Sequence, residues 1–543
     1  MNLIPISVNH TKSWLDPLFL LIRRIPIASR IKIALIDTLQ ETVTKVVQQT
    51  GLLHNCKYAD VRIGINEMKH ASAEDGKAKC AGEDVSISFG IRVLAGEMTA
   101  WGYYGQELGE AESTPKSIHK KLTLGMHTAY ARAITNAKKK AEFQSLAPSL
   151  REVNLAKIDI CNDTVHATFD EDPRNVLLKD IIALCTTTSQ DMRSISKDVH
   201  YTYAHVQTGI NREFFCSTEG ACIDQSYALT QGVVSVVAQK AGGIPEICYD
   251  YVGDLRGWEV LKDKNVYQQS FDEFALLRTR ETLELIDAEF LSATDEPVIV
   301  VTNPHFNALL VHEIVGHPTE ADRALKLETA YAGRSWLFRD FDDNELGKQI
   351  ASPLLTAYSD PSIHGYGHYK YDMEGTPGKR VNLIENGIFK GFMNGREQAA
   401  ILNQPPNGSM RATESYYVPL VRMTNTVFAN GNTPPSEIIA EVRDGYYIVN
   451  HRIPSISESR ENFRISSQRV YKIENGQIAT LYRQGGITAD SKDFLMNIDA
   501  IGNDFEVFPI PHCGKGQPMQ IMRVGNGSPT LRSKARLTGH QEL

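Results

Sequence analysis

The chain has 543 residues, 42% of them hydrophobic and 22% charged, which is the composition of a globular protein large enough for two or more cores. Its net charge of -8 gives no basic surface for holding phosphates, so nucleic acid is not expected as a partner. The apolar run over residues 15–22 is too short to cross a bilayer and contains Asp16 and Pro17, so no membrane span is expected either.

The eight cysteines are scattered along the chain, without a CxxC pair or a tight framework. Secreted proteins that depend on disulfides concentrate their cysteines, whereas scattered cysteines are typical of a reducing compartment. The sequence therefore predicts a cytoplasmic protein.

The first half of the chain is expected to combine helices with an antiparallel sheet. Amphipathic spacing and helix-start signals predict helices over residues 29–50, 115–146, 172–198 and 270–292. Alternating polar and apolar residues predict strands over residues 58–67, 85–94, 98–105, 200–215 and 221–237. The third of these strands should pair with the second through a turn at Ala95-Gly96.

A break at Asp295-Glu296-Pro297 predicts an N-terminal α+β domain over residues 1–294 and a C-terminal β-rich, barrel-like domain over residues 295–543. In the second domain, β-forming runs lie at residues 297–301, 379–393, 415–428, 437–450, 468–483 and 505–510. Asn386-Gly387 and Asn475-Gly476 are hairpin signals between them. One embedded helix carries the motif described next, and a second helix is expected over residues 320–337. The predicted fold class is α+β.

One stretch of the second half carries the residue types of a hydrolytic zinc site. An apolar run leads into His312 and Glu313, and His317 follows five residues after the first histidine. In a zinc hydrolase, imidazoles hold the metal, the metal lowers the pKa of a water to about 7, and a carboxylate takes the proton. Residues five apart on a straight α-helix are rotated by about 140°, so a regular helix cannot aim both rings at one ion. We therefore predict that the helix unwinds or forms a π-bulge between Ile314 and Pro318.

Such a site needs a third protein ligand, and zinc accepts oxygen, nitrogen and thiolate donors. The candidates are Glu320, Asp322, His512 and Cys513. Cys513 is expected in a glycine-rich loop that follows a strand. His305, upstream of the motif, is expected at the surface or at the helix cap rather than at the metal. Taken alone, the motif also fits a buried helix whose histidines are hydrogen-bonded.

Five separate stretches, all in the second half and in family order, resemble the TldD/PmbA metallopeptidases. They are His312-Glu313-Ile314-Val315-Gly316-His317 with Glu320 and Asp322, Glu374-Gly375-Thr376-Pro377-Gly378, Leu383-Ile384-Glu385-Asn386-Gly387 with Lys390-Gly391, Arg422-Met423-Thr424-Asn425-Thr426, and Cys513-Gly514-Lys515-Gly516-Gln517. A single motif of this kind arises by chance, but five in order are far more specific.

The resemblance implies a zinc-dependent peptidase that cleaves unfolded or extended peptides and holds one zinc ion per catalytic chain. It implies His312, His317 and Cys513 as the zinc ligands and Glu313 as the general base. Family members form homodimers, or heterodimers with a metal-free paralogue. This chain looks like the catalytic kind because it keeps the His-Glu motif.

Other residues are expected to act around this site. Glu320 and Asp322 are expected next to the metal ligands, where carboxylates orient histidines, and Glu320 also remains open as a ligand. Polar walls of a substrate site are expected from Arg422, Asn425, and Tyr416 or Tyr417.

Two other functions remain compatible with the sequence. A non-catalytic peptide-binding or maturation subunit would hold a structural metal with four protein ligands and no open position. A zinc hydrolase that acts on a non-peptide amide would share the site and differ in its substrate.

Overall fold

The computed structural model describes residues 33–109, 112–144, 151–328 and 333–539. Its α-helices are α1 (Leu35–Gly51), α2 (Pro115–Phe143), α3 (Leu178–Ser194), α4 (Phe271–Leu285), α5 (Pro304–Val311), α6 (Ala321–Ala324), α7 (Arg396–Leu402), α8 (Pro435–Ala440) and α9 (Ser491–Met496). Within these ranges, no helix is long and apolar enough to cross a membrane. The first four residues of the helix predicted over 29–50 lie outside the described residues, and α1 forms most of the rest.

Two of the predicted helices begin where their capping residues place them. Thr114 accepts a hydrogen bond from the amide of Ser117 at the start of α2, and Pro115 takes the first helical position, where no amide hydrogen is needed. Ser270 and Glu273 form a reciprocal capping box at the start of α4. The helix predicted over residues 172–198 is divided, because a 3-10 turn precedes α3.

The first half of the chain builds a seven-stranded sheet in the order β3-β2-β1-β5-β6-β4, with β7 paired to β6. Its strands are β1 (Cys56–Glu74), β2 (Lys77–Ala95), β3 (Ala100–Leu108), β4 (Asn162–Val165), β5 (Val199–Ser217), β6 (Cys222–Ala238) and β7 (Glu246–Asp254). The predicted pairing of the second and third strands is confirmed. The long strands run past their predicted ends, because the antiparallel ladder continues through polar residues that show no clear alternation.

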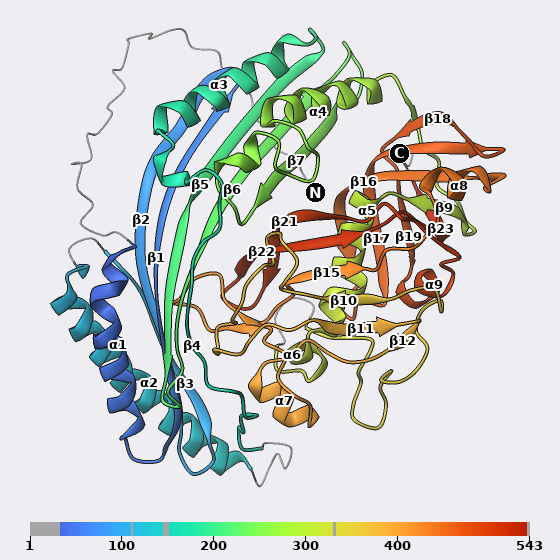
Figure 1. The fold of residues 1–543 in the computed structure, drawn as a ribbon. Helices are drawn as coiled ribbons and strands as arrows, with labels where there is room; N and C mark the ends of the chain where they lie inside the picture. Colours follow the sequence, from blue (N-terminus) through green and yellow to red (C-terminus); the bar gives the residue numbers. More distant parts are fainter. Residues whose placement is uncertain (1–32, 110–111, 145–150, 329–332, 540–543) are drawn as a thin grey trace, which may run out of the picture. The chain divides into compact units, whose positions relative to one another are not determined.

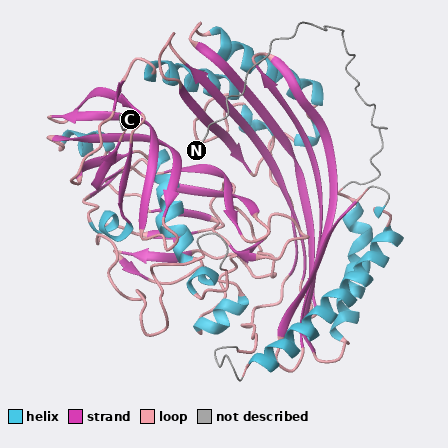
Figure 2. Ribbon diagram, turned by 180° about the vertical axis from the view of Figure 1, so that it is seen from behind, coloured by secondary structure: helices cyan, strands magenta, loops and turns pink. Residues whose placement is uncertain are grey.

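The two faces of this sheet differ in chemistry because side chains alternate along each strand. Val61, Ile63 and Ile65 pack in one core with α1 and α2, which lie on the outer side of the curved sheet (Figures 1 and 2). The inner face is polar and meets the second half of the chain. There, Arg92 forms ion pairs with Asp60 at 2.5 Å and with Glu374 at 3.0 Å. Buried charges of this kind tie the two halves together in one geometry.

The second half contains a closed barrel of five strands. β16 (Asp444–Ile456), β9 (Val298–Thr302), β23 (Leu531–Thr538), β19 (Gly486–Asp490) and β17 (Asn462–Glu474) pair in this order, and the pairing of β16 with β17 closes the ring. β8 (Glu289–Phe290), β18 (Gln477–Arg483) and β20 (Ala500–Ile501) extend this sheet. The hairpin signal at Asn475-Gly476 is confirmed, since both residues take positive φ, 49° and 79°, and join β17 to β18. The α+β class with a barrel-like second half is thereby confirmed.

A six-stranded sheet lies beside the barrel, in the order β12-β11-β10-β15-β22-β21. Its strands are β10 (Ala357–Ser359), β11 (Val381–Glu385), β12 (Ile388–Phe389), β15 (Asn425–Phe428), β21 (Glu506–Lys515) and β22 (Gln520–Ser528), and a two-stranded ribbon joins β13 (Met410–Arg411) to β14 (Leu420–Val421). α5 packs between this sheet and the barrel, with β16 on one side and β22 on the other. The helix that carries the motif is therefore enclosed by strands.

Two predictions for the second half are wrong. The helix expected over residues 320–337 is reduced to the four residues of α6, because Lys326 takes a positive φ of 59° and the amides of Leu327 and Glu328 turn back to the carbonyl of Asp322. The strand expected over residues 437–450 begins only at Asp444, and α8 takes the preceding residues. The domain boundary between residues 294 and 295 stays a prediction.

Candidate metal centre

The motif lies at the end of α5, every residue of which is buried. Asn303 caps the helix by accepting a hydrogen bond from the amide of Phe306, and Pro304 occupies the first turn. The Asn307 side chain donates to the carbonyls of Thr302 and Pro529, which fixes the helix against the strands around it. The motif is thus carried by a capped and fully buried helix.

The helix changes pitch where the motif begins. His312–Gly316 forms a π-helical turn, in which the amide of His317 donates to the carbonyl of His312, and a 3-10 turn over residues 317–319 follows. A π-turn contains about one extra residue, so side chains five apart return to the same side. The two imidazole rings lie with centroids 4.7 Å apart and planes at 85°. The predicted bulge between residues 314 and 318 is confirmed.

Cys513 joins the two histidines from a distant part of the chain. Its Sγ lies 3.8 Å from Nε2 of His317, and the ligand atoms of His312, His317 and Cys513 all lie within 4.8 Å of one another. The cysteine was expected in a loop but lies within β21, whose pairing with β22 shifts register between Ile510 and Cys513. That irregularity in the strand accompanies the presentation of the thiol to the helix.

Hydrogen bonds orient both rings. Nδ1 of His312 lies 3.0 Å from Oδ1 of Asn526, and the Nδ2 of that amide donates to the carbonyl of Thr426. Because the amide nitrogen is used elsewhere, its oxygen faces the ring, so Nδ1 of His312 donates to Asn526 and Nε2 is the atom left for the rest of the group. Nδ1 of His317 contacts Oε2 of Glu320 at 3.1 Å in the same manner.

Glu320 is itself held by cations. Its Oε2 accepts from Nε of Arg323 at 2.7 Å and from Nζ of Lys515 at 3.2 Å. Burial would raise the pKa of Glu320, but the charges of Lys515, His317 and Arg323 hold it well below its usual value. Nζ of Lys515 also lies 2.6 Å from Oδ1 of Asp322. Glu320 thus lies directly behind His317, as a carboxylate that orients a ligand does, whereas Asp322 reaches the group only through Lys515.

The electrostatics of the three-residue group favour a bound cation. Burial would raise the pKa of the Cys513 thiol, but the charges of His312, Arg422 and His317 hold it well below its usual value. Burial would lower the pKa of His312, but the Cys513 thiolate raises it to about 9. One thiolate and two Nε2 atoms form a donor set that zinc accepts, and binding of a metal ion would displace the proton that the thiolate holds on His312. The residues present therefore fit the predicted metal.

The carboxylate of Glu313 is bound by a residue outside the His/His/Cys group. Its Oε2 accepts from Nη1 of Arg460 at 2.5 Å, and Arg460 lies in the turn between β16 and β17 with a φ of 68°. Ser491 donates to the Arg460 carbonyl at 2.7 Å and fixes this turn. Both Glu313 and Arg460 are at least nine-tenths buried. The carboxylate is thus oriented from the side of the barrel.

Arg422 and Asn425, predicted as walls of a substrate site, are fully buried. The guanidinium of Arg422 donates to the carbonyls of Cys513 and Gln520, so it supports the strand that carries the cysteine. The side chain of Asn425 donates to the carbonyl of Ile363 at 2.7 Å and holds a neighbouring loop. In this structure both residues serve the framework of the site.

Two other histidines lie away from the metal group. His305 was expected at the surface or at the helix cap; it lies in the first turn of α5, two residues after the capping Asn303, but it is 3% exposed and its ring stacks on His451 with centroids 4.4 Å apart. The prediction of a surface position is therefore wrong, because α5 enters the protein from its first turn. His512, the alternative third ligand, hydrogen-bonds the hydroxyl of Tyr249 at 3.0 Å and is not part of the group.

Sequence reasoning missed Asn526 and Arg460. Lys515 lies within one of the family motifs. The sequence could have suggested that this lysine forms an ion pair with the acidic residues that follow His317. Asn526 lies in a Gly-Asn-Gly run that is typical of a turn, yet it belongs to β22. No local signal points to Arg460, since a charged residue in a strand connection is ordinary.

The fold and the site together define a class of protein. Two histidines on a bulged helix, a glutamate beside them and a cysteine from a neighbouring strand form a buried group that could hold a metal ion, as metal-dependent hydrolases do. Residues 295–539 match the family model described as the PmbA/TldA metallopeptidase C-terminal domain. The predicted resemblance to the TldD/PmbA metallopeptidases is thereby confirmed.

Two known proteins resemble the chain over about nine-tenths of its length, and a third resembles it over about half. A metalloprotease of Methanocaldococcus jannaschii is 27% identical over 493 residues, which are 90% of this chain and 98% of the relative. A zinc metalloprotease TldD homolog of Saccharolobus solfataricus is 32% identical over 249 residues, 46% of this chain and 52% of the relative. The solved structure of TldE from Thermococcus kodakarensis has the same fold, with a TM-score of 0.65, 15% identity and coverage of 93% of this chain and 100% of that chain.

Proposed function

We propose that the protein is a zinc-dependent peptidase that cleaves unfolded or extended peptides, with Glu313 as the general base. The observation that carries this proposal is that His312, His317 and Cys513 converge at one buried point. Glu313 directly follows the first of these histidines in sequence. The relatives named as metalloproteases support the same class of reaction at the level of the family.

In this proposal the imidazoles hold the metal through Nε2, because Asn526 and Glu320 occupy both Nδ1 atoms. One thiolate and two neutral imidazoles leave a divalent ion with positive charge, and three protein ligands leave a position for the substrate. When bound, zinc supplies Lewis-acid chemistry, lowering the pKa of a water to about 7 and polarising the scissile carbonyl.

Glu313 takes the proton of the attacking water and returns it to the leaving amine. Arg460 occupies Oε2 of this carboxylate, and no described residue donates to Oε1, which is therefore the oxygen that exchanges the proton. Arg460 is a positioning residue in this scheme, because its guanidinium fixes the direction in which the carboxylate points. Preorganised charges of this kind act strongly in a buried site.

The alternative of a non-catalytic subunit predicts a structural metal with four protein ligands. In the described part of the chain, three residues form the group and no fourth histidine, cysteine or carboxylate joins it. This supports a site with an open position. A zinc hydrolase of a non-peptide amide would use the same residues, so a substrate screen separates it from a peptidase.

We also propose that the protein acts in the cytoplasm as a homodimer or as a heterodimer with a metal-free paralogue. Scattered cysteines support the compartment, and the family resemblance supports the assembly. Light scattering coupled to size-exclusion chromatography measures the assembly. A mass equal to one chain, both alone and after mixing with the paralogue, would contradict the proposed dimer.

The proposed function is tested by Glu313→Gln. Wild-type protein should contain about one zinc per chain and cleave a mixed peptide library, as read by mass spectrometry. The variant should retain its zinc and lose activity by about 10²- to 10⁴-fold, the usual contribution of a general base. Glu437→Gln, on the exposed surface of α8, is the matched control and should keep full activity. Full activity in metal-free protein would refute the proposal.

A further inference from the structure

A cavity of about 440 Å³ lies between the seven-stranded sheet and the second half of the chain. Its walls come from the inner face of β1, β2, β5 and β6, from residues 366–373, from β13 and the loop after it, and from β22. None of the metal-centre residues lines it. The volume is in the range of about 300–1,000 Å³ that is typical of small-molecule sites. The cavity therefore has the size of a ligand site that is separate from the metal.

β22 borders both the metal centre and the cavity. The side chain of Asn526 reaches His312, whereas Arg523, three positions earlier and therefore on the opposite face of the strand, lines the cavity. Met522, which pairs with Cys513, also reaches the cavity wall. The cavity thus lies one strand away from the metal centre and shares none of its three candidate ligands.

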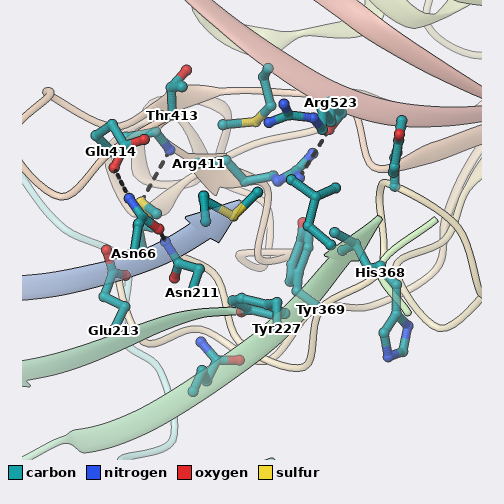
Figure 3. Close-up of a pocket in the computed structure, with 18 of the residues that line it drawn as sticks. Asn66, Asn211, Glu213, Tyr227, His368, Tyr369, Arg411, Thr413, Glu414 and Arg523 are labelled. Atoms are coloured by element: carbon teal, nitrogen blue, oxygen red, sulfur yellow. Dashed lines mark hydrogen bonds between the residues drawn. The ribbon is translucent and has the colours of Figure 1, made fainter. Parts of the chain in front are cut away.

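One end of the cavity is acidic (Figure 3). Glu414 accepts from the side chain of Asn66 at 2.8 Å, and Asn66 in turn accepts from Asn211. Glu213 lies beside them, 8% exposed, and accepts from the hydroxyl of Ser415 at 2.5 Å. Neither glutamate forms an ion pair with a residue that the structure describes. Burial raises the pKa of Glu414 to about 7 and raises that of Glu213 as well.

The other end is basic. The guanidinium of Arg411 donates to the carbonyls of Met423 at 2.7 Å and Arg523 at 3.3 Å and lies 5.1 Å from the ring centroid of Tyr369. Arg523 donates from Nε to the side chain of Gln231 at 3.2 Å. Neither arginine forms an ion pair within the described ranges of the chain. Figure 3 shows Arg411 and Arg523 across the cavity from Glu414 and Asn66.

Charges in a protein interior are normally paired, because an unpaired one loses its hydration without compensation. Here Glu213, Glu414, Arg411 and Arg523 line one cavity and form no ion pair with a described residue. The other two carboxylates in its wall already have partners, since Asp84 pairs with His70 and Asp372 accepts backbone amides. A ligand that carries an ammonium group and a carboxylate would complete both ends at once, and Tyr227 and Tyr369 line the space with aromatic surface. Two separate ions would leave the volume between the ends unused.

We propose that this cavity is a second binding site, which takes short zwitterionic peptides with the ammonium group at Glu213 and Glu414 and the carboxylate at Arg411 and Arg523. The interaction at each end is a charge-assisted hydrogen bond, and the arginines offer the planar donors that suit a carboxylate.

The test uses metal-loaded wild-type protein and probes without a backbone peptide bond, so that hydrolysis cannot interfere. Titration calorimetry with 4-aminobutanoate, 6-aminohexanoate and 8-aminooctanoate, at up to about 10 mM, covers a range of spacings between the charges. At least one should bind saturably. Its N-acetyl and carboxamide derivatives, each lacking one charge, should bind at least about tenfold more weakly.

Two variants assign the ends. In Glu414→Gln the N-acetyl derivative should bind about as tightly as the free probe, while the carboxamide should still bind more weakly. In Arg523→Gln the carboxamide should bind about as tightly as the free probe, while the N-acetyl derivative should still bind more weakly. The exposed residues Glu437 and Arg536 provide matched controls, and Glu437→Gln and Arg536→Gln should leave both ratios unchanged. Circular dichroism checks folding.

The comparison of capped and free probes on wild-type protein tests the proposal even where a variant fails to fold. Absence of binding by every free probe, or equal binding of free and capped probes, would overturn it. Saturable binding of calcium alone that is lost in Glu414→Gln, or of phosphate alone that is lost in Arg523→Gln, would show that the ends bind separate ions. Either result would overturn the proposal of one ligand that spans both ends.

Discussion

On one face of β22, Asn526 belongs to the metal centre. In that group each imidazole has a hydrogen-bond partner for its Nδ1 atom, and the thiol of Cys513 is held as an anion. On the other face, Arg523 belongs to a cavity in which charged groups of both signs have backbone or amide partners but no counter-ion. The same strand thus borders a site whose orienting contacts are complete and a site whose charges are left for a ligand.

This difference indicates what each site is built to bind. A metal ion needs donor atoms that are aimed before it arrives, so hydrogen bonds and ion pairs behind the ligands are made in advance. A charged organic ligand brings its own hydrogen-bonding groups, so the protein keeps some of its charges unpaired until binding. Substitutions that affect one face of β22 and not the other can test this distinction.

The largest effect is expected from Cys513→Ala. Loss of one of three donors should reduce the zinc content from about one ion per chain to nearly none, because two imidazoles alone hold zinc weakly. Elemental analysis after dialysis measures it, and binding of zwitterionic probes at the cavity should not change. Cys248→Ala, which removes another buried thiol, should keep its zinc. Retained zinc in the Cys513 variant would contradict a three-residue centre.

A smaller effect is expected from Asn526→Ala, which removes the partner of His312 and leaves the three ligands in place. Groups that orient a ligand typically contribute about 10- to 100-fold to metal affinity, and the affinity for zinc should fall by that amount. Competition with a zinc chelator measures the change. Asn211→Ala, the matched amide on the cavity side, should leave zinc affinity unchanged. Equal losses in both variants would mean that the two faces are not independent.

The smallest effect is expected in the pH dependence of stability at the cavity. Burial raises the pKa of Glu414 to about 7, above the value near 4.3 of an unfolded glutamate, so between these pH values the folded state binds the extra proton. This group therefore favours folding at low pH and opposes it as the pH rises toward 7 and above.

The difference in melting temperature between Glu414→Gln and wild type should consequently shift in favour of the variant as the pH increases from 5 to 8. At pH 8 the shift should reach about 1–2 °C. Differential scanning calorimetry across this pH range measures the gain. Saturation of wild-type protein with a zwitterionic probe should reduce the difference. A constant difference at every pH would show that the carboxyl does not titrate in this window.

The local features of the metal centre could be predicted from the sequence where they depend on neighbours along the chain. The five-residue spacing of His312 and His317, with Pro318 after them, required a departure from α-helical geometry, and the π-turn confirms it. The hairpins at Asn386-Gly387 and Asn475-Gly476 follow from residues that accept positive φ. Propensity failed for the helix expected over residues 320–337, since contacts of Ala321 and Asp322 with the rest of the protein end it early.

The sequence by itself determined the pitch change of the motif helix, the alternation of the long strands and, through five ordered motifs, the family of the second half. Only the tertiary structure decided that Asn526 orients His312, that Arg460 holds Glu313, and that Arg411 and Arg523 face Glu213 and Glu414 across one cavity. The physical reason is distance along the chain. Periodicity and turn chemistry act over a few residues, whereas these partners are brought together by sheet pairing between segments that are far apart in the sequence.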